Sequence, residues 1–242
     1  MILKKKNFNI SQITDKVNLN LTVFLIFFGI NSFYYYLNRH NFAELSIQER
    51  LPSEKEVIFN SLGDNEAYFR VLALELQYMG DTYGRSTPLK DYDYKLLYNW
   101  FKLLDKLDNE SDYVPSLASY YYSMTPRIKD IQYLVDYLKE HSLDRIDTKW
   151  WWIYQASYLA FHKLEDQKQG IEIADHLVNA KGDLPIWVRQ LPAIYHEKVG
   201  DKEEAFLIIK NIMDNIDNIS EHELNFMNIF LKDRLKIIEN NN

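Results

Sequence analysis

Trp152-Ile153-Tyr154-Gln155 is followed 35 residues later by Trp187-Val188-Arg189-Gln190, and each segment opens a stretch that continues in parallel with the other. Self-similarity at a fixed period of about 20 to 50 residues is typical of repeat proteins, in which each repeat is one supersecondary unit. Because apolar residues recur at helical spacing in both copies, the sequence predicts stacked pairs of helices. The further matching pairs are Leu159 with Ile194, Asp166 with Asp201, Gly170 with Ala205, Ile171 with Phe206 and Ala174 with Ile209.

The second copy includes the turn Gly200-Asp201-Lys202-Glu203-Glu204-Ala205. Here the chain resembles the tetratricopeptide repeat (TPR) family, in which a Gly-Asp turn between helices A and B is followed four residues later by a small residue where the helices touch. The resemblance implies an all-α solenoid of helical hairpins whose A helices line a groove. It covers about residues 65–216, in roughly four units of 34 to 38 residues. Leu134 stands where a small residue is expected, and the segments near Pro115 and Pro126 depart from the pattern, so the number of units stays open.

Breaks in the pattern divide the chain into five parts. Ser53-Glu54-Lys55-Glu56 is typical of a capping box and predicts the start of the helical domain. The last predicted helix, from Glu221 to Ile238, has apolar residues on one face and is expected to shield the final repeat from water. The expected parts are an N-terminal tail at residues 1–16, a transmembrane helix at 17–38, a connector at 39–52, the TPR-like domain at 53–219 and a capping helix with a tail at 220–242.

The N-terminal part predicts a membrane anchor. No charged residue occurs from Val17 to Asn38, and most residues between Leu21 and Leu37 are Leu, Val, Ile, Phe or Tyr. Roughly 20 such residues span the core of a bilayer, and Tyr34-Tyr35-Tyr36 suits the interface where a helix leaves the lipid. The alternatives are a buried helix of a soluble fold or a cleaved signal peptide, but no small-residue cleavage site follows.

The basic residues near this segment predict its orientation. Cytoplasmic flanks carry the excess of Lys and Arg, which here places the N-terminus in the cytoplasm. The use of 20 Lys against 8 Arg is typical of AT-rich bacterial genes, so we expect a single-pass protein of the bacterial inner membrane with a periplasmic domain. The counted residues are Lys4, Lys5, Lys6 and Lys16 before the segment, and Arg39 and Arg50 after it.

The composition excludes several classes of function. The net charge of −7 gives little support to a nucleic-acid partner, which needs clustered Lys and Arg. The absence of Cys removes disulfides, thiol nucleophiles and Cys-based metal sites. The motifs of P-loop, Rossmann and nucleophile-elbow enzymes are also missing, so we expect no catalytic residue and no cofactor.

Metal binding is weighed at two places in the sequence. The carboxylates of Asp105, Asp108, Glu110 and Asp112 suggest either a calcium loop or a solvated helix end followed by an N-cap, and the calcium loop lacks the Gly and bidentate Glu of an EF-hand. The six His residues form no pair at a helical metal spacing, although His162 and His196 fall near the ends of adjacent A helices. We therefore expect no metal site.

Aromatic residues point to a binding surface. Successive helix residues differ by about 100°, so Trp150-Trp151-Trp152 and Tyr120-Tyr121-Tyr122 each direct at least one ring away from the local core. That ring either packs on the next repeat or lines a concave groove suited to an extended peptide or a partner helix. The register that the resemblance implies puts these residues in the groove: Arg70, Gln77, Trp152, Gln155, His162, Trp187, Gln190 and Glu197.

A long insertion, Gly80 to Tyr94, interrupts the first unit where a repeat turn needs about three residues. It is either a binding loop, with Arg85 offering a fork for a carboxylate, or a structural loop in which Arg85 pairs with Asp91 or Asp93. The candidate binding residues of this loop are Tyr83, Arg85, Asp91 and Asp93.

These patterns together predict a membrane-anchored TPR-like scaffold that binds another protein or a peptide segment and supports the assembly or stability of an envelope complex. The alternatives are an obligate structural subunit, which would expose a large apolar patch when isolated, and an envelope enzyme with a site near residues 80–94, which would have a deep pocket.

Overall fold

The computed structural model describes residues 10–39, 47–81, 84, 86–216 and 219–235, with side chains from residue 19 onward. The chain divides into two compact units, Met1–Leu45 and Ser46–Asn242. Regular structure in the described ranges is helical throughout, which confirms the expected all-α class.

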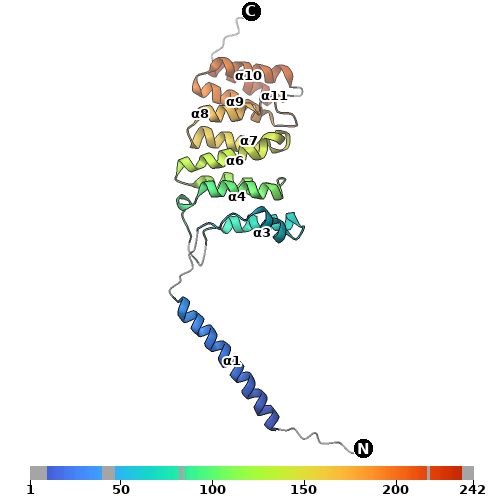
Figure 1. The fold of residues 1–242 in the computed structure, drawn as a ribbon. Helices are drawn as coiled ribbons and strands as arrows, with labels where there is room; N and C mark the ends of the chain where they lie inside the picture. The colour runs from blue at the N-terminus through green and yellow to red at the C-terminus, as the bar shows by residue number, and fades with distance from the viewer. Residues whose placement is uncertain (1–9, 40–46, 82–83, 85, 217–218, 236–242) are drawn as a thin grey trace, which may run out of the picture. The chain divides into compact units, whose positions relative to one another are not determined.

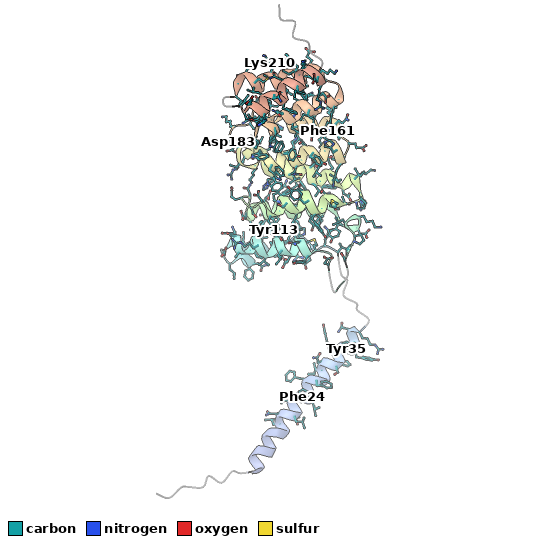
Figure 2. The ribbon with its side chains drawn as sticks, turned by 180° about the vertical axis from the view of Figure 1, so that it is seen from behind. Phe24, Tyr35, Tyr113, Phe161, Asp183 and Lys210 are labelled. Atoms are coloured by element: carbon teal, nitrogen blue, oxygen red, sulfur yellow. The ribbon has the colours of Figure 1, made fainter. Side chains whose placement is uncertain are left out.

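The first unit contains one long helix, α1 (Ile10–Asn38), which begins before the expected boundary at residue 17. Its segment Leu19–Asn38 is long and apolar enough to cross a membrane, and its large apolar side chains are exposed within this unit. Phe24 and Tyr35 project outward from this helix (Figure 2), and both side chains are exposed. An apolar helix without a protein core around it is what a lipid environment accommodates.

The second unit is a stack of helices. Figure 1 shows the helices from α3 to α10 stacked side by side from one end of this unit to the other, in approximate chain order. Short 3-10 and π turns, labelled η, extend or connect several helices. The elements are α2 (Glu54–Ser61), α3 (Asn65–Tyr78), η1 (Leu89–Asp91), α4 (Tyr94–Leu107), α5 (Tyr113–Ser116), η2 (Leu117–Tyr121), η3 (Tyr122–Met124), η4 (Ile128–Asp130), α6 (Ile131–Ser142), η5 (Leu143–Arg145), α7 (Ile146–Tyr158), η6 (Leu159–Lys163), α8 (Gln167–Asp175), α9 (Ile186–Val199), α10 (Lys202–Asn215), α11 (Glu221–Ile229) and η7 (Phe230–Arg234).

Side-chain caps fix where these helices begin. The predicted capping box at Ser53 is confirmed, because its hydroxyl accepts from the Glu56 amide and the Glu56 carboxylate accepts from the Ser53 amide. Asp166 and Asp201, the matched aspartates of the two copies, are the N-caps of α8 and α10. An aspartate at this position satisfies an amide that the first turn leaves unpaired, which explains why both copies carry it. Gly200, at φ 90°, takes the left-handed conformation that ends α9.

The small residues of the repeat pattern lie where helices touch. A side chain added at Gly170 in α8 would bring its Cβ to 2.6 Å from Cβ and 2.8 Å from Cα of Phe161 in η6. Ala205, its counterpart in α10, is fully buried, and α10 packs against α9. Leu134 of α6, at the corresponding position of the preceding hairpin, is also fully buried, and there α6 contacts η2.

Within the second unit, several hydrogen bonds join neighbouring helical hairpins. Ser119 Oγ donates to Gln155 Oε1 at 3.1 Å across 36 residues, and Tyr137 Oη donates to Asp105 Oδ1 at 2.9 Å across 32 residues. Glu197 accepts from Arg234 across 37 residues. Other hydrogen bonds between hairpins span 28 to 46 residues, so each hairpin contacts those near it in the sequence.

Buried tyrosines in the core of the second unit predict how the stability of the protein responds to alkali. Burial raises the pKa of Tyr92 and Tyr94 to about 12, and raises that of Tyr122 further. In the unfolded chain these hydroxyls ionise near pH 10, so the unfolded state binds fewer protons and stability is lost as pH rises through about 10 to 12. We expect helical circular dichroism to fall in that window, with the tyrosinate absorbance of the buried rings rising only in parallel. Complete tyrosine ionisation at unchanged helicity would contradict this expectation.

Candidate functional site

An aromatic surface extends from η2 across α7 to α9. Three of its side chains are well exposed, Tyr120 at 51%, Tyr158 at 41% and Trp187 at 43%. Three more are partly buried between them. We call this surface the aromatic face; its residues are Tyr120, Trp150, Trp151, Tyr154, Tyr158 and Trp187.

Ring-to-ring contacts join the aromatic face across two units. The Trp187 ring of α9 lies edge-on to Trp150 and Tyr154 of α7, with centroids 6.0 and 5.3 Å apart. Trp151 and Tyr154 lie 5.1 Å apart along α7, and Tyr154 and Tyr158 lie 6.4 Å apart. Spacings of three and four residues place these side chains on one side of α7. The Trp150–Trp187 contact shows that one ring of the tryptophan run packs on α9.

Hydrogen bonds fix the orientation of the rings on the η2 side. Trp151 Nε1 donates to the hydroxyl of Tyr120 at 2.8 Å, and Gln155 Nε2 approaches the same oxygen at 3.4 Å. Gln155 is held in turn by Ser119. The polar edges of these rings are therefore satisfied within the protein, while apolar surface stays open to solvent. Rigid aromatic side chains of this kind lose little conformational entropy when a partner covers them.

The structure corrects two of the expected groove residues. Trp152 and Gln190 are each only 4% exposed, so neither lines an open surface. Trp152 Nε1 instead donates to Asp112 Oδ1 at 2.8 Å. The buried arc of α7 contains Trp152, Ile153 and Ala156, so Trp150 and Trp151, which are partly buried, are the two tryptophans of this run that reach the surface. Gln155 and Trp187, by contrast, belong to the surface that carries the aromatic face.

The other expected groove residues lie on helices of three different units. Arg70 of α3 is exposed, pairs with Glu66 and lines a pocket of about 570 Å³ that includes Leu74 and Tyr113. Gln77 accepts a hydrogen bond from Tyr113. His162 of η6 contacts the Tyr158 ring at 4.8 Å, and Glu197 of α9 pairs with Arg234. Burial, followed by the charge of Lys198, lowers the pKa of His162, so its imidazole is neutral at pH 7.

The 80–94 insertion is described only in part. Tyr83 and Arg85, and with them the predicted pairing of Arg85, lie outside the described residues. Asp93 is the N-cap of α4 and accepts from the amides of Lys95 and Leu96 at 2.9 and 3.0 Å. Asp91, in η1, is exposed and lines an open pocket of about 350 Å³. Asp93 therefore caps helix α4.

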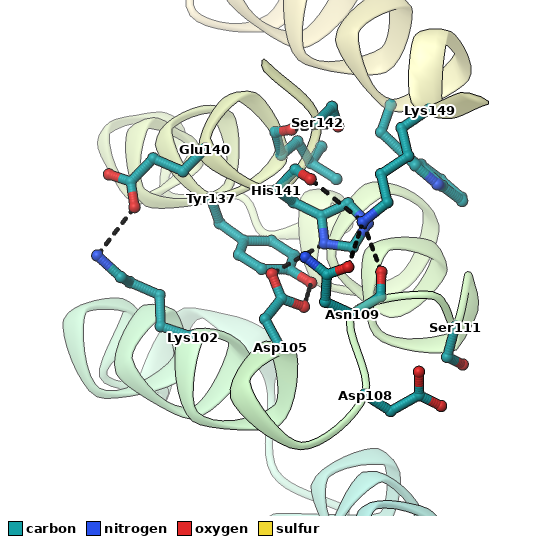
Figure 3. Close-up of polar contacts among 12 residues, drawn as sticks. Lys102, Asp105, Asp108, Asn109, Ser111, Tyr137, Glu140, His141, Ser142 and Lys149 are labelled. Atoms are coloured by element: carbon teal, nitrogen blue, oxygen red, sulfur yellow. Dashed lines mark hydrogen bonds and ion pairs between the residues drawn. The ribbon is translucent and has the colours of Figure 1, made fainter. Parts of the chain in front are cut away.

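A buried polar cluster links α4, α6 and α7 (Figure 3), and the sequence analysis did not anticipate it. Asp105 of α4 accepts from the Tyr137 hydroxyl and contacts Nδ1 of His141 at 2.8 Å. The side chain of His141 is 1% exposed. Lys149 directs its ammonium group to the carbonyl and side-chain oxygens of Asn109, and burial lowers the pKa of Lys149. We call these five residues the Asp105 cluster.

The geometry of the Asp105 cluster is that of a structural connection. Its donors are directed at protein oxygens on neighbouring elements, and its imidazole is closed to solvent. Asp112 and Glu110, which the sequence grouped with Asp105, bind Trp152 and Arg145 instead. Among the described residues no three His, Asp or Glu side chains gather as metal ligands.

Comparison of the chain with protein-family models, with curated proteins and with solved structures gives no match. The assignment of a function therefore depends on the surface chemistry of the chain itself.

Proposed function

We propose that the protein is a membrane-anchored scaffold whose TPR-like helical repeats bind a segment of another protein on the aromatic face. The observation that carries this proposal is a set of exposed rings, oriented by internal contacts, that extends over η2, α7 and α9. Aromatic side chains dominate the hot spots of protein interfaces. An extended peptide or an amphipathic helix would cover the rings, and the amide of Gln155 beside them would fix its direction.

The anchor concentrates this binding at a membrane surface. Confinement of both partners to two dimensions raises their effective concentration in the way that a linker does. In this proposal α1 spans the bacterial inner membrane with its N-terminus in the cytoplasm, and the helical domain functions in the periplasm to support an envelope complex. A single Cys at Leu207, in a chain that otherwise has none, tests the orientation. We expect a membrane-impermeant maleimide to label it in intact spheroplasts.

Photocrosslinking tests the binding surface. A photoreactive residue at Trp187 in native membranes is expected to give one discrete protein adduct, whereas the same residue at Leu207 on α10, which is 52% exposed, is expected to give none. Adducts from both positions would favour an obligate subunit embedded in a complex. No adduct from either would overturn the proposal.

The energetic contribution of the aromatic face gives a matched prediction. Trp187→Ala removes a ring that Trp150 and Tyr154 hold in place, and such truncations weaken binding by about tenfold or more. Leu207→Ala, at a similar exposure, is the control and is expected to leave affinity unchanged. Affinity is measured by titration with the partner that photocrosslinking identifies. Equal affinities for the two variants would contradict a role for the aromatic face.

A further inference from the structure

Helix α2 ends in an exposed apolar tip. Ile58, Phe59 and Leu62 are exposed by 73%, 77% and 88%, more than any other large apolar side chain described in the second unit. Their positions in the helix place them within an arc of about 100°. Lys55 falls inside the same arc, is exposed, and makes no ion pair with a described residue. We call Ile58, Phe59 and Leu62 the α2 tip.

The backbone at Leu62 makes this exposure unusual. Leu62 ends α2 in the left-handed conformation, with φ 50° and ψ 24°. Only one other described non-glycine residue, Glu165, has a positive φ. Glycine or asparagine is the usual residue at such a helix end, because a Cβ is strained there. The chain thus places a large apolar side chain where the fold favours a small or polar one and where water surrounds it.

The tip is not the loose end of an undocked helix. The opposite side of α2 is packed, since Val57 and Ser61 are buried. The capping box of Ser53 and an ion pair of 3.1 Å between Glu54 and Lys106 of α4 hold the helix further. The outward direction of the α2 tip is therefore fixed by the fold.

Helix α3 has a second uncovered apolar strip. Val71, Leu74 and Tyr78 are exposed by 50% to 59%, and helical spacing places them opposite the buried Phe69 and Leu72. At the other end of the unit α11 and η7 bury Met227 and Phe230 against the last hairpin. Terminal repeats of a stacked array need a polar outer face or a cover, and on α3 the exposed apolar strip lies beside the exposed charges of Glu66 and Arg70.

The length of the connection indicates what covers the α2 tip. Fifteen residues separate Asn38, the last residue of the candidate span, from Glu54, the first of α2. Fully extended, they reach about 50 to 55 Å. A connection of this length lets the α2 tip reach the bilayer that α1 is proposed to span, and an apolar arc with a lysine within it is typical of helices that lie in the lipid interface.

We propose that the α2 tip inserts into the interfacial region of that bilayer, with Lys55 among the headgroups. This inference rests on the proposed membrane anchoring of α1. The second contact with the membrane orients the helical stack, so that the aromatic face has a defined direction relative to the membrane plane.

The test uses the full chain in nanodiscs of zwitterionic lipid that hold one chain each. Because the sequence has no Cys, single cysteines at Phe59, Leu207 and Phe27 carry an environment-sensitive NBD probe in three separate samples. Lipids with a doxyl quencher near the headgroup report contact with the interface, and lipids with a doxyl group deep in the acyl chain report insertion. Leu207→Cys is the control for an exposed apolar site outside the tip, and Phe27→Cys reports α1.

We expect shallow quenching at position 59 at least threefold stronger than at position 207, and deep quenching at position 27. Equal quenching at 59 and 207 would overturn the proposal for the tip while leaving the anchor intact. Discs that hold two chains test a second copy of the chain as the alternative cover. If the probe at position 59 is shielded from water only in those discs, and lipid quenchers do not reach it, a second copy covers the tip and the lipid contact is overturned. No deep quenching at 27 would overturn the anchor and this inference together.

A second variant separates lipid contact from a structural role. Leu62→Gly relieves the left-handed leucine and removes an apolar side chain from the tip. We expect Tm to be unchanged or higher, and the shallow quenching at position 59 to fall at least twofold. A lower Tm with unchanged quenching would show that Leu62 serves the fold and would overturn its role in the lipid contact.

Discussion

Gly170→Val is expected to destabilise the helical domain by about 3 kcal/mol, the largest effect that we expect from a single added side chain. A Cβ at this position lies within 2.9 Å of three atoms of Phe161, two of which are backbone atoms. Backbone cannot rotate away as a side chain can, so α8 must move off η6, and overpacking of this kind costs about 1 to 3 kcal/mol or more. Chemical denaturation followed by circular dichroism measures the change.

The control for Gly170, which lies within α8, is Gly200, the glycine that ends α9. A Cβ added at Gly200 would meet no atom within 4 Å, but the residue has a φ of 90°. Gly200→Ala therefore tests backbone strain without a clash and is expected to cost about 1 to 2 kcal/mol. If the two substitutions cost the same, or if Gly170→Ala costs nothing, helix contact does not explain the small residue at position 170.

Asp105→Ala is expected to cost about 3 kcal/mol. The change removes the acceptor of the buried Tyr137 hydroxyl and the partner of His141 Nδ1. Each buried polar group left without a partner costs about 1 to 3 kcal/mol. Asp105→Asn retains an acceptor oxygen and is expected to lose less than half as much. Urea denaturation of both variants measures the difference.

A neighbouring acid gives the control for the Asp105 cluster. Glu110, five residues further on, pairs with Arg145 at the surface, and both side chains are well exposed. Surface ion pairs contribute about 0 to 1 kcal/mol, so Glu110→Ala is expected to leave stability almost unchanged. Comparable losses from Asp105→Ala and Glu110→Ala would show that burial does not set the strength of the Asp105 contacts.

Local signals in the sequence predicted where some helices begin, although α1 begins at Ile10 and not at residue 17. Ser53 with Glu56, and Asp166 and Asp201 in the repeat turns, act through atoms within a few residues of themselves. Such caps depend on local geometry alone, so a pattern in the sequence is enough to identify them. The apolar character of residues 17–38 is equally local, and α1 follows from it.

The contacts between helical hairpins could not be predicted from local patterns in the sequence. Trp151 and Trp152 are chemically alike, and only the packing of α7 decides which is exposed. The Asp105 cluster joins residues 32 and 36 positions apart, and in the sequence Asp105 looks like one of four acids near a helix end. The left-handed Leu62 is also invisible there, because Gly63, the next residue, is the more obvious turn residue.

The contacts between hairpins join residues that are at most a few tens of positions apart, which has a consequence for biosynthesis. A hydrogen bond such as Ser119 to Gln155 becomes possible once 36 more residues have emerged, so no early segment waits for the C-terminus. Stacked units of this kind can nucleate at one end and propagate, and domains generally fold N-terminal part first during synthesis. The helical domain is therefore suited to vectorial folding, one hairpin at a time, during synthesis. The last hairpin is completed only when Phe230 and Leu235 arrive to close its core.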